Sequence, residues 1–292
     1  MEQQIRALLA WLPEQEAIVT IRGHIPGPTE DTNPQKEIWR NARRAVDERG
    51  VYVGEAPQLD PIPAQMQARA DAFRLRADVN GALQGLDWTL GVANLNSVLS
   101  FQKFVVQEHA TDRANAVVTN DPESLFSFCL PDQAEDTHLP GAIDQDQKAI
   151  TFSSLNPNLR IGGHAAVEVE LPTVVGQPPT KRQLIGFFIT FGASFLQIAE
   201  YNGRWFVRDG YHRCYGLLRR GIDRVPCVFI RARSFEELVP QQAGFFPFEV
   251  LFGNKPPMLK DFLDDAVSRS VGRMATRKVV RVLAQDFLVV VE

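Results

Sequence analysis

The residues with the greatest chemical potential lie in one short segment, residues 204–214, which reads RWFVRDGYHRC. An apolar run ends there at Asp209 and Gly210, and a helical pattern begins directly after them. A helix that begins at this point brings its unpaired N–H groups and the positive end of its dipole close to His212 and Arg213. Such a combination is typical of a site for anions, and for phosphate in particular.

The side chains of this segment have properties that suit a phosphate ligand. Gly210 lets the backbone approach a ligand closely and adopt unusual φ values. Arg213 has a planar guanidinium that can donate two hydrogen bonds to phosphate oxygens. His212 can donate a hydrogen bond, and its protonation can change near neutral pH. Asp209 would repel a bare phosphate, so a role beside the ligand requires Mg²⁺ or an incoming hydroxyl group.

A structural interpretation of the same residues stays open. Asp209 could be the N-cap of the helix, His212 could be packed in a satisfied environment, and Arg213 could pair with an acidic side chain. Cys214 lies about one turn into the helix, where a thiol pKa can be lowered. Burial against neighbouring leucines is nevertheless the expected role of Cys214.

The pattern around the segment predicts a β-hairpin, a helix and a further strand. Asn202-Gly203 between two apolar runs is a strong hairpin signal. Gly221 ends the predicted helix, and Pro226 suits the start of a strand or an edge strand. The expected elements are strands at 195–201, 204–208 and 225–230 and a helix at 211–220.

Residues upstream of the hairpin predict one more strand and one more helix. Residues 164–171 alternate between apolar and polar side chains, which is typical of a strand. Thr180 opens a capping-box pattern that predicts an apolar helix ending near residue 192. The predicted order over about residues 162–232 is therefore strand, helix, strand, strand, helix, strand.

The five residues Asp209-Gly210-Tyr211-His212-Arg213, placed after the hairpin and before the strand in GIDRVPCV, resemble the DG-x-HR signature of the ParB/sulfiredoxin-like superfamily. The resemblance covers about a quarter of the chain, residues 162–232. No family is recognised in residues 1–160 or 240–292. The resemblance implies a compact α/β module with the order of elements given above.

The resemblance also implies a function for each residue of the motif. Gly210, Tyr211, His212 and Arg213 would bind the phosphates of a nucleoside triphosphate, ATP or CTP. Asp209 and His212 would be catalytic, and Asp209 would bind Mg²⁺. The expected reaction is phosphoryl transfer, with a small molecule as a possible acceptor, or hydrolysis of the triphosphate.

Members of the superfamily differ at the motif, and these differences indicate which form of the motif this sequence resembles most. Kinases that phosphorylate small hydroxy compounds have a DGHHR form, from which this sequence departs only at Tyr211. ParB proteins have a Gly-Glu-Arg-Arg type motif and use it as a CTP switch. Sulfiredoxins place their nucleophilic cysteine at the position of Tyr211, so their reaction is disfavoured here. The motif is therefore closest to the kinase-like form.

Composition and charge are those of a globular protein. The chain has 292 residues, of which 45% are hydrophobic and 23% charged, and its net charge is −4. No apolar stretch approaches the roughly 20 residues that cross a bilayer, and no signal peptide is recognised. The three cysteines lack metal-ligand spacing. We expect a cytoplasmic protein without membrane contact.

The charge is unevenly distributed along the chain. Residues 204–233 contain eight arginines and two aspartates, a local charge of +6. This excess is consistent with a solvated surface or with an anion-binding region around the motif.

The whole chain is expected to be an α+β protein with three parts. Residues 1–160 would be a mixed α+β region of unknown role, residues 161–240 the ParB/sulfiredoxin-like nucleotide-binding module, and residues 241–292 an extension packing on it. Outside the module the patterns predict helices at 2–12, 34–49, 63–77, 121–130 and 259–269, strands within 88–106, a loop at 131–148 and a β-hairpin at 279–291.

Two further functions compete with an enzyme that acts on nucleotides. One is a nucleotide-dependent binding or regulatory protein associated with DNA, as ParB relatives are. The single helix predicted after the module and the net acidity of the chain speak against DNA as a partner. The other is a purely structural use of the fold.

Overall fold

The computed structural model describes residues 2–23, 31–53, 58–132, 139–146, 148–154, 159–171, 180–190, 195–238 and 244–285. The described residues contain both helices and β-sheets, so the expected α+β class is confirmed. Contacts within the chain form two units. Unit 1 consists of Met1–Gln133 and Ser194–Met274, and unit 2 consists of Ala134–Ala193 and Ala275–Glu292.

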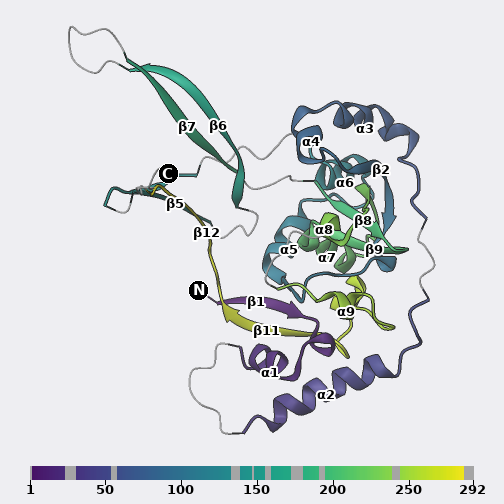
Figure 1. The fold of residues 1–292 in the computed structure, drawn as a ribbon. Helices are drawn as coiled ribbons and strands as arrows, with labels where there is room; N and C mark the ends of the chain where they lie inside the picture. Colours follow the sequence, from purple (N-terminus) through teal and green to yellow (C-terminus); the bar gives the residue numbers. More distant parts are fainter. Residues whose placement is uncertain are drawn as a thin grey trace, which may run out of the picture. The chain divides into compact units, whose positions relative to one another are not determined.

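The main sheet of unit 1 has the strand order β2-β10-β8-β9 (Figure 1). β10 runs antiparallel to β2 and parallel to β8, and β8 and β9 form an antiparallel hairpin. Asn202 and Gly203 connect that hairpin with φ values of 52° and 73°, which explains the Asn-Gly signal. The strands are β2 (Asp87–Asn94), β8 (Gln197–Tyr201), β9 (Arg204–Asp209) and β10 (Arg224–Arg231). The predicted hairpin and the strand after the helix are therefore confirmed.

β10 is an inner strand, and every residue from 225 to 230 is buried. Its proline is tolerated because pairing with β8 begins only at Val228, two residues after Pro226. The proline therefore lies beside β2 alone. The expectation that Pro226 stands near the start of a strand is correct, although the strand is not at the edge of the sheet.

Three helices position the motif, and one of them, α6, packs on β10 of this sheet. α7 (Tyr211–Arg219) begins one residue after β9 ends, as predicted. α6 (Pro122–Cys129) has Asp121 as its N-cap and also confirms a predicted helix. α5 (Gln107–Asn115) packs closely on α7 because Gly216 has no side chain. A Cβ atom at Gly216 would overlap the Ala110 carbonyl oxygen and lie 2.7 Å from Ala114 Cβ.

A second sheet of unit 1 has the order β11-β1-β3 and is antiparallel. The helix predicted at 2–12 is wrong, because residues 2–7 form its central strand and only residues 9–11 are helical. Ile5 pairs with both Val106 and Val271, and this long-range pairing outweighs the local helical pattern. The helix predicted at 259–269 is also wrong, since a 3₁₀ turn there leads into β11. These elements are β1 (Glu2–Ala7), η1 (Leu9–Trp11), β3 (Phe104–Val106), η4 (Leu259–Leu263) and β11 (Arg269–Met274).

The remaining elements of unit 1 are short apart from α2 (Asn33–Asp47), which confirms the helix predicted at 34–49. The helix predicted at 63–77 is present as η2 followed by α3. The others are α1 (Glu14–Arg22), η2 (Ala64–Met66), α3 (Gln67–Arg74), α4 (Ala77–Ala82), η3 (Leu95–Ser97), α8 (Phe235–Leu238) and α9 (Phe248–Leu251).

Unit 2 consists of β-structure in its described residues. One sheet has the order β12-β5-β4, and β6 and β7 form a separate antiparallel pair. β4 lies inside the predicted loop 131–148. β12, the first strand of the hairpin predicted at 279–291, pairs with β5, and residues 286–291 of that hairpin lie outside the described residues. The strands are β4 (Ala142–Asp144), β5 (Ala149–Ser154), β6 (Arg160–Leu171), β7 (Thr180–Thr190) and β12 (Lys278–Leu283).

The helix predicted from Thr180 to about residue 192 is wrong, because these residues form β7. Pairing with β6 extends from Leu171↔Thr180 to Arg160↔Thr190, with one register shift between Ile161 and Gly163, and it supplies the hydrogen bonds that a helix would have made locally. The run Phe187-Phe188-Ile189 also suits a strand better than a helix. The strand predicted at 164–171 is correct, as part of β6.

The contacts divide the chain differently from the boundaries expected at 160/161 and 240/241. β6 and β7 belong to unit 2, whereas β8, β9, α7 and β10 belong to unit 1. Residues 162–232 are therefore not one compact module. The sheet around the motif is completed by β2, which comes from the N-terminal region.

Candidate functional site

The motif lies at a sharp turn from β9 into α7, as its sequence predicts. Asp209 is the last residue of β9, and Gly210 is the N-cap residue of α7 with φ of 95°. The N–H of Cys214 donates to the Gly210 carbonyl oxygen at 2.9 Å and closes the first helical turn. The N-cap residue of α7 is Gly210, so Asp209 does not hold the N-cap position that the structural interpretation gave it. A left-handed φ explains the glycine, because other residues adopt it with strain.

Arg213 turns back over the glycine and is buried, with only 5% of its surface exposed. A Cβ atom at Gly210 would lie 3.3 Å from Arg213 Nη2 and 3.4 Å from its Nε. Arg213 Nη1 donates to the carbonyl oxygen of Phe128 at 3.4 Å, near the end of α6. Burial lowers the pKa of Arg213, and the nearby Asp209 carboxylate raises it. Arg213 therefore connects the motif turn with α6 while keeping its positive charge at the helix start.

His212 lies in a positively charged environment that α7 shares with α5. Its ring and that of His109 are 5.0 Å apart, edge to face. Burial is the largest cause that lowers the pKa of His212 to about 3, and the positive charges of the neighbouring His109, Arg113 and Arg213 contribute to the same shift. His212 is consequently neutral near pH 7, where one ring nitrogen can donate a hydrogen bond and the other accept one.

The two residues contributed by α5 were missed in the sequence. His109 and Arg113 are four residues apart, and on a helix this spacing places them on one face. Both are partly exposed, as is His212. The sequence contains the spacing, but an isolated His-x-x-x-Arg pair on a polar helix is too common to indicate a site.

The Tyr211 side chain faces the interior, which differs from the phosphate-binding role expected for it. Only 7% of its surface is exposed, and its ring centroid is 6.0 Å from that of Phe245. Burial raises the pKa of its phenol, so the side chain stays neutral. The structure thus brings Asp209, Gly210, His212 and Arg213 together, and it places the Tyr211 side chain in the core.

The thiol chemistry of the site is suppressed by burial. Cys214 is fully buried, as are Cys129 and Cys227, and all three are free thiols. Burial raises the pKa of Cys129 to about 12 and raises that of Cys214 well above its usual value. The helix start therefore does not activate Cys214, in agreement with the packing role expected for it.

Within the described part of the chain, no group of three or more His, Cys, Asp or Glu side chains could hold a metal ion. Asp209 is therefore not part of such a group. Such an arrangement does not fit a metal held by protein ligands alone. It fits Mg²⁺ that is bound largely through phosphate oxygens and water, because Mg²⁺ commonly uses only one or two carboxylates in nucleotide sites.

Comparisons of the chain with protein-family models, with curated proteins and with solved structures found no match. Among the described helices, none has the length and apolar character needed to cross a membrane. The functional argument consequently depends on the residues and geometry of this site.

Proposed function

We propose that the chain binds the phosphates of a nucleoside triphosphate, ATP or CTP, at the first turn of α7. The observation that carries the proposal is the meeting of basic side chains from α5 and α7 beside a left-handed glycine at the helix start. His109 and Arg113 approach from α5, and His212 and Arg213 belong to α7. The resemblance of the motif to the DG-x-HR signature supports the same ligand.

Electrostatics supports an anionic ligand at this place. The basic neighbours of His212 lower its pKa, which means that they disfavour any further positive charge there. A phosphate group would offset this repulsion, and the amides and dipole of the α7 start favour negative charge as well. Gly210 would let the backbone approach the phosphate without interference from a side chain.

Phosphoryl transfer or triphosphate hydrolysis is the reaction that we propose for the site. Asp209 stands close enough to Arg213 to raise its pKa, so a carboxylate and a guanidinium lie together at the turn. With Mg²⁺ and a triphosphate bound, the carboxylate would help to hold the metal or accept the proton of an attacking hydroxyl. Arg213 and His212 would stabilise the negative charge of the phosphates, with a small hydroxy compound or water as the acceptor.

The alternative is a nucleotide-dependent binding protein associated with DNA. The described residues that follow β10 contain the four-residue helices α8 and α9, the 3₁₀ turn η4 and then β11. Each of these helices is about one turn long, which is too short for the recognition helix that a helix-turn-helix reader places in the major groove. The proposal therefore favours the enzyme.

Calorimetric titration with ATP, CTP, GTP and ADP, each with and without Mg²⁺, tests the binding step. Arg113→Ala should weaken the bound triphosphate about tenfold or more, as expected when a hydrogen bond to a charged group is lost. Arg219→Ala removes the same charge from the exposed far end of α7 and is the matched control. Arg113 is preferred to Arg213 for the test, because Arg213 is buried and its removal should also destabilise the fold. Absence of triphosphate binding, or equal affinity in both variants, would contradict the proposal.

Asp209→Asn separates an enzyme from a binder. If the site transfers or hydrolyses phosphate, this variant should retain nucleotide binding and lose turnover by roughly 10²-fold or more. The measurement is ADP or phosphate release in the presence of Mg²⁺ and a mixture of small hydroxy compounds. Nucleotide binding without turnover in the wild-type protein would favour the binding protein over the enzyme.

A further inference from the structure

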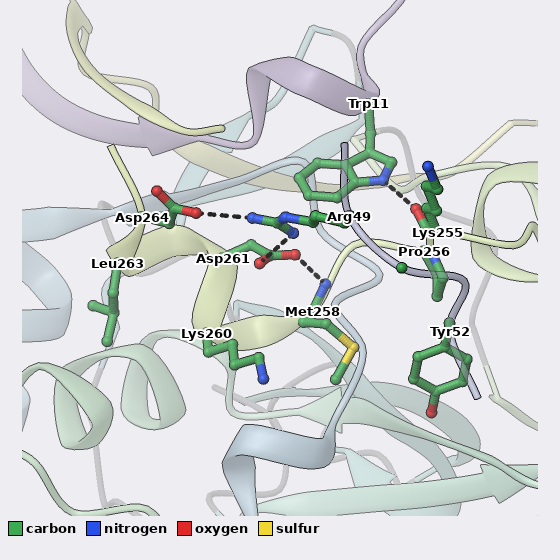
Figure 2. A pocket seen from close by; sticks show the side chains of 11 residues that line it. Trp11, Arg49, Tyr52, Lys255, Pro256, Met258, Lys260, Asp261, Leu263 and Asp264 are labelled. Carbon is green, nitrogen blue, oxygen red and sulfur yellow. Dashed lines mark hydrogen bonds and ion pairs between the residues drawn. The ribbon is translucent and has the colours of Figure 1, made fainter. Parts of the chain in front are cut away.

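A second place in unit 1 has the properties of a ligand site and shares no residue with the motif. It is a cavity of about 530 Å³ (Figure 2). Three segments form it: the η1 turn, the residues that follow α2, and the segment leading into η4. Its lining residues include Trp11, Arg49, Tyr52, Lys255, Lys260 and the pair Asp261 and Asp264.

Two aromatic rings give the cavity fixed apolar walls. The Trp11 side chain is buried, and its indole N–H donates to the Lys255 carbonyl oxygen at 2.7 Å. Tyr52 is tied to the opposite segment by its backbone N–H, which donates to the Asn254 carbonyl oxygen at 2.7 Å. The Arg204 guanidinium lies 5.0 Å from the centre of the Tyr52 ring. Held in this way, the two rings suit a flat apolar group with little loss of side-chain freedom.

The acidic groups of the cavity are already paired within the protein. Asp261 is 3% exposed, accepts the Met258 N–H at 2.8 Å and pairs with Arg49 at 2.9 Å. Arg49 also pairs with Asp264 at 2.8 Å, and its guanidinium lies 5.6 Å from the centre of the Trp11 ring. Figure 2 shows Arg49 between the two carboxylates. The acids and the arginine thus form a polar wall that is satisfied without a ligand.

The basic groups exceed the acidic ones by one charge, and the excess is accessible. Lys255 donates to the Asp47 carbonyl oxygen at 2.5 Å, and no carboxylate among the described residues forms an ion pair with it. Lys260 is exposed and makes no ion pair within 4 Å among the residues that the structure describes. A ligand with one negative charge would therefore complement this cavity.

We propose that the cavity binds a small molecule with a planar ring and one anionic group, the ring against Trp11 and Tyr52 and the anion towards Lys260. The volume falls in the range of about 300–1,000 Å³ that is usual for small-molecule sites. Fixed aromatic walls with a few placed polar groups are the usual composition of such sites. The inference is independent of nucleotide binding at α7.

The probe that tests the inference is 2-naphthoate, compared with its neutral amide 2-naphthamide. The two compounds have the same rings and differ in charge, and neither contains a phosphate that would bind at α7. Naphthoate should bind about tenfold more tightly than the amide, as one hydrogen bond to a charged group implies. On binding, the indole N–H resonance of Trp11, assigned with Trp11→Phe, should shift, whereas that of Trp88 should not.

Variants locate the site and separate it from general anion binding. Lys260→Ala should weaken naphthoate about tenfold and leave the amide unchanged. Tyr52→Ala should weaken both compounds, because it removes a ring contact. Lys278→Ala removes an exposed lysine of unit 2 and should change neither affinity. Equal affinity for acid and amide, no binding of naphthoate at millimolar concentration, or full affinity in Lys260→Ala would each overturn the inference.

Discussion

Replacing Gly216 by alanine tests the close packing of α5 and α7 that positions the basic side chains. Gly216 lies in the middle of α7, where alanine would ordinarily stabilise a helix by about 1 kcal/mol. A Cβ atom here, however, would overlap the carbonyl oxygen of Ala110 and lie 2.7 Å from Ala114 Cβ. The first obstacle is backbone and cannot rotate away, so the two helices would have to separate.

The magnitude follows from two opposing effects. Inserting a methyl group into a well-packed contact costs typically about 1–3 kcal/mol. The upper part of that range applies to Gly216, because the obstacle is a helix backbone rather than a flexible side chain. After subtraction of the helix-propensity gain, we expect a net loss of about 1–2 kcal/mol in the free energy of unfolding.

A matched control is available in α4. Gly81 is also a helical glycine, but nothing lies within 4 Å of the Cβ that alanine would add. Gly81→Ala should therefore raise the free energy of unfolding by about 0.5–1 kcal/mol. Urea unfolding measured by circular dichroism gives both values, with the midpoint as the comparison. A Gly216→Ala protein as stable as the wild type, or more stable, would refute the proposed helix contact.

Three further predictions concern the motif and its surroundings. The folded-state pKa of His212 lies below its unfolded value, so its contribution to stability is present above about pH 6.5 and is lost as the pH falls towards 3. Unfolding midpoints between pH 7 and pH 4 should accordingly fall less in His212→Gln than in the wild type, and equal slopes would contradict the depressed pKa. The three cysteines should resist iodoacetamide at pH 8 until the protein unfolds, as mass spectrometry can show; labelling of the native protein would revive a thiol mechanism. Gly210→Ala should destabilise more than Gly221→Ala, because both glycines have positive φ but only the first has Arg213 against it; equal losses of stability would argue that Arg213 does not pack on the turn.

The elements nearest the motif could be predicted from the sequence because their signals are local. The Asn202-Gly203 turn requires positive φ values that few residue pairs adopt easily, and it fixes the β8-β9 hairpin. The change from a strand to a helix at Gly210 is likewise encoded by adjacent residues. These short-range signals are also why the turn geometry of the candidate site agrees with its prediction.

The failures share a physical cause, which is pairing between distant segments. The local pattern of β1 predicts a helix, because the strands that pair with it, β3 and β11, lie about 100 and 270 residues further along the chain. The sequence of β7 also predicts a helix, because it contains a capping-box pattern, whereas its pairing with β6 leaves no local signal in the sequence. The α5 contribution was missed for the same reason: the contact between His109 and His212 joins residues that are far apart in the sequence.

At the motif, helix packing stabilises the free protein, whereas the gathering of basic side chains is unfavourable. A bound phosphate would relieve the second effect, and this links the structure with the proposed ligand. The close approach at Gly216 stabilises the helix pair, and the burial of His212 and the nearness of His109 and Arg113 lower the pKa of His212. A bound phosphate would reverse the sign of this effect, because an anion raises the pKa of a neighbouring histidine. Triphosphate binding should therefore take up protons and strengthen as the pH falls. It should also raise apparent stability, by about 2.7 kcal/mol at a hundredfold excess over Kd. Calorimetry in buffers of different ionisation enthalpy measures the proton uptake, and binding without it would place the phosphates away from His212.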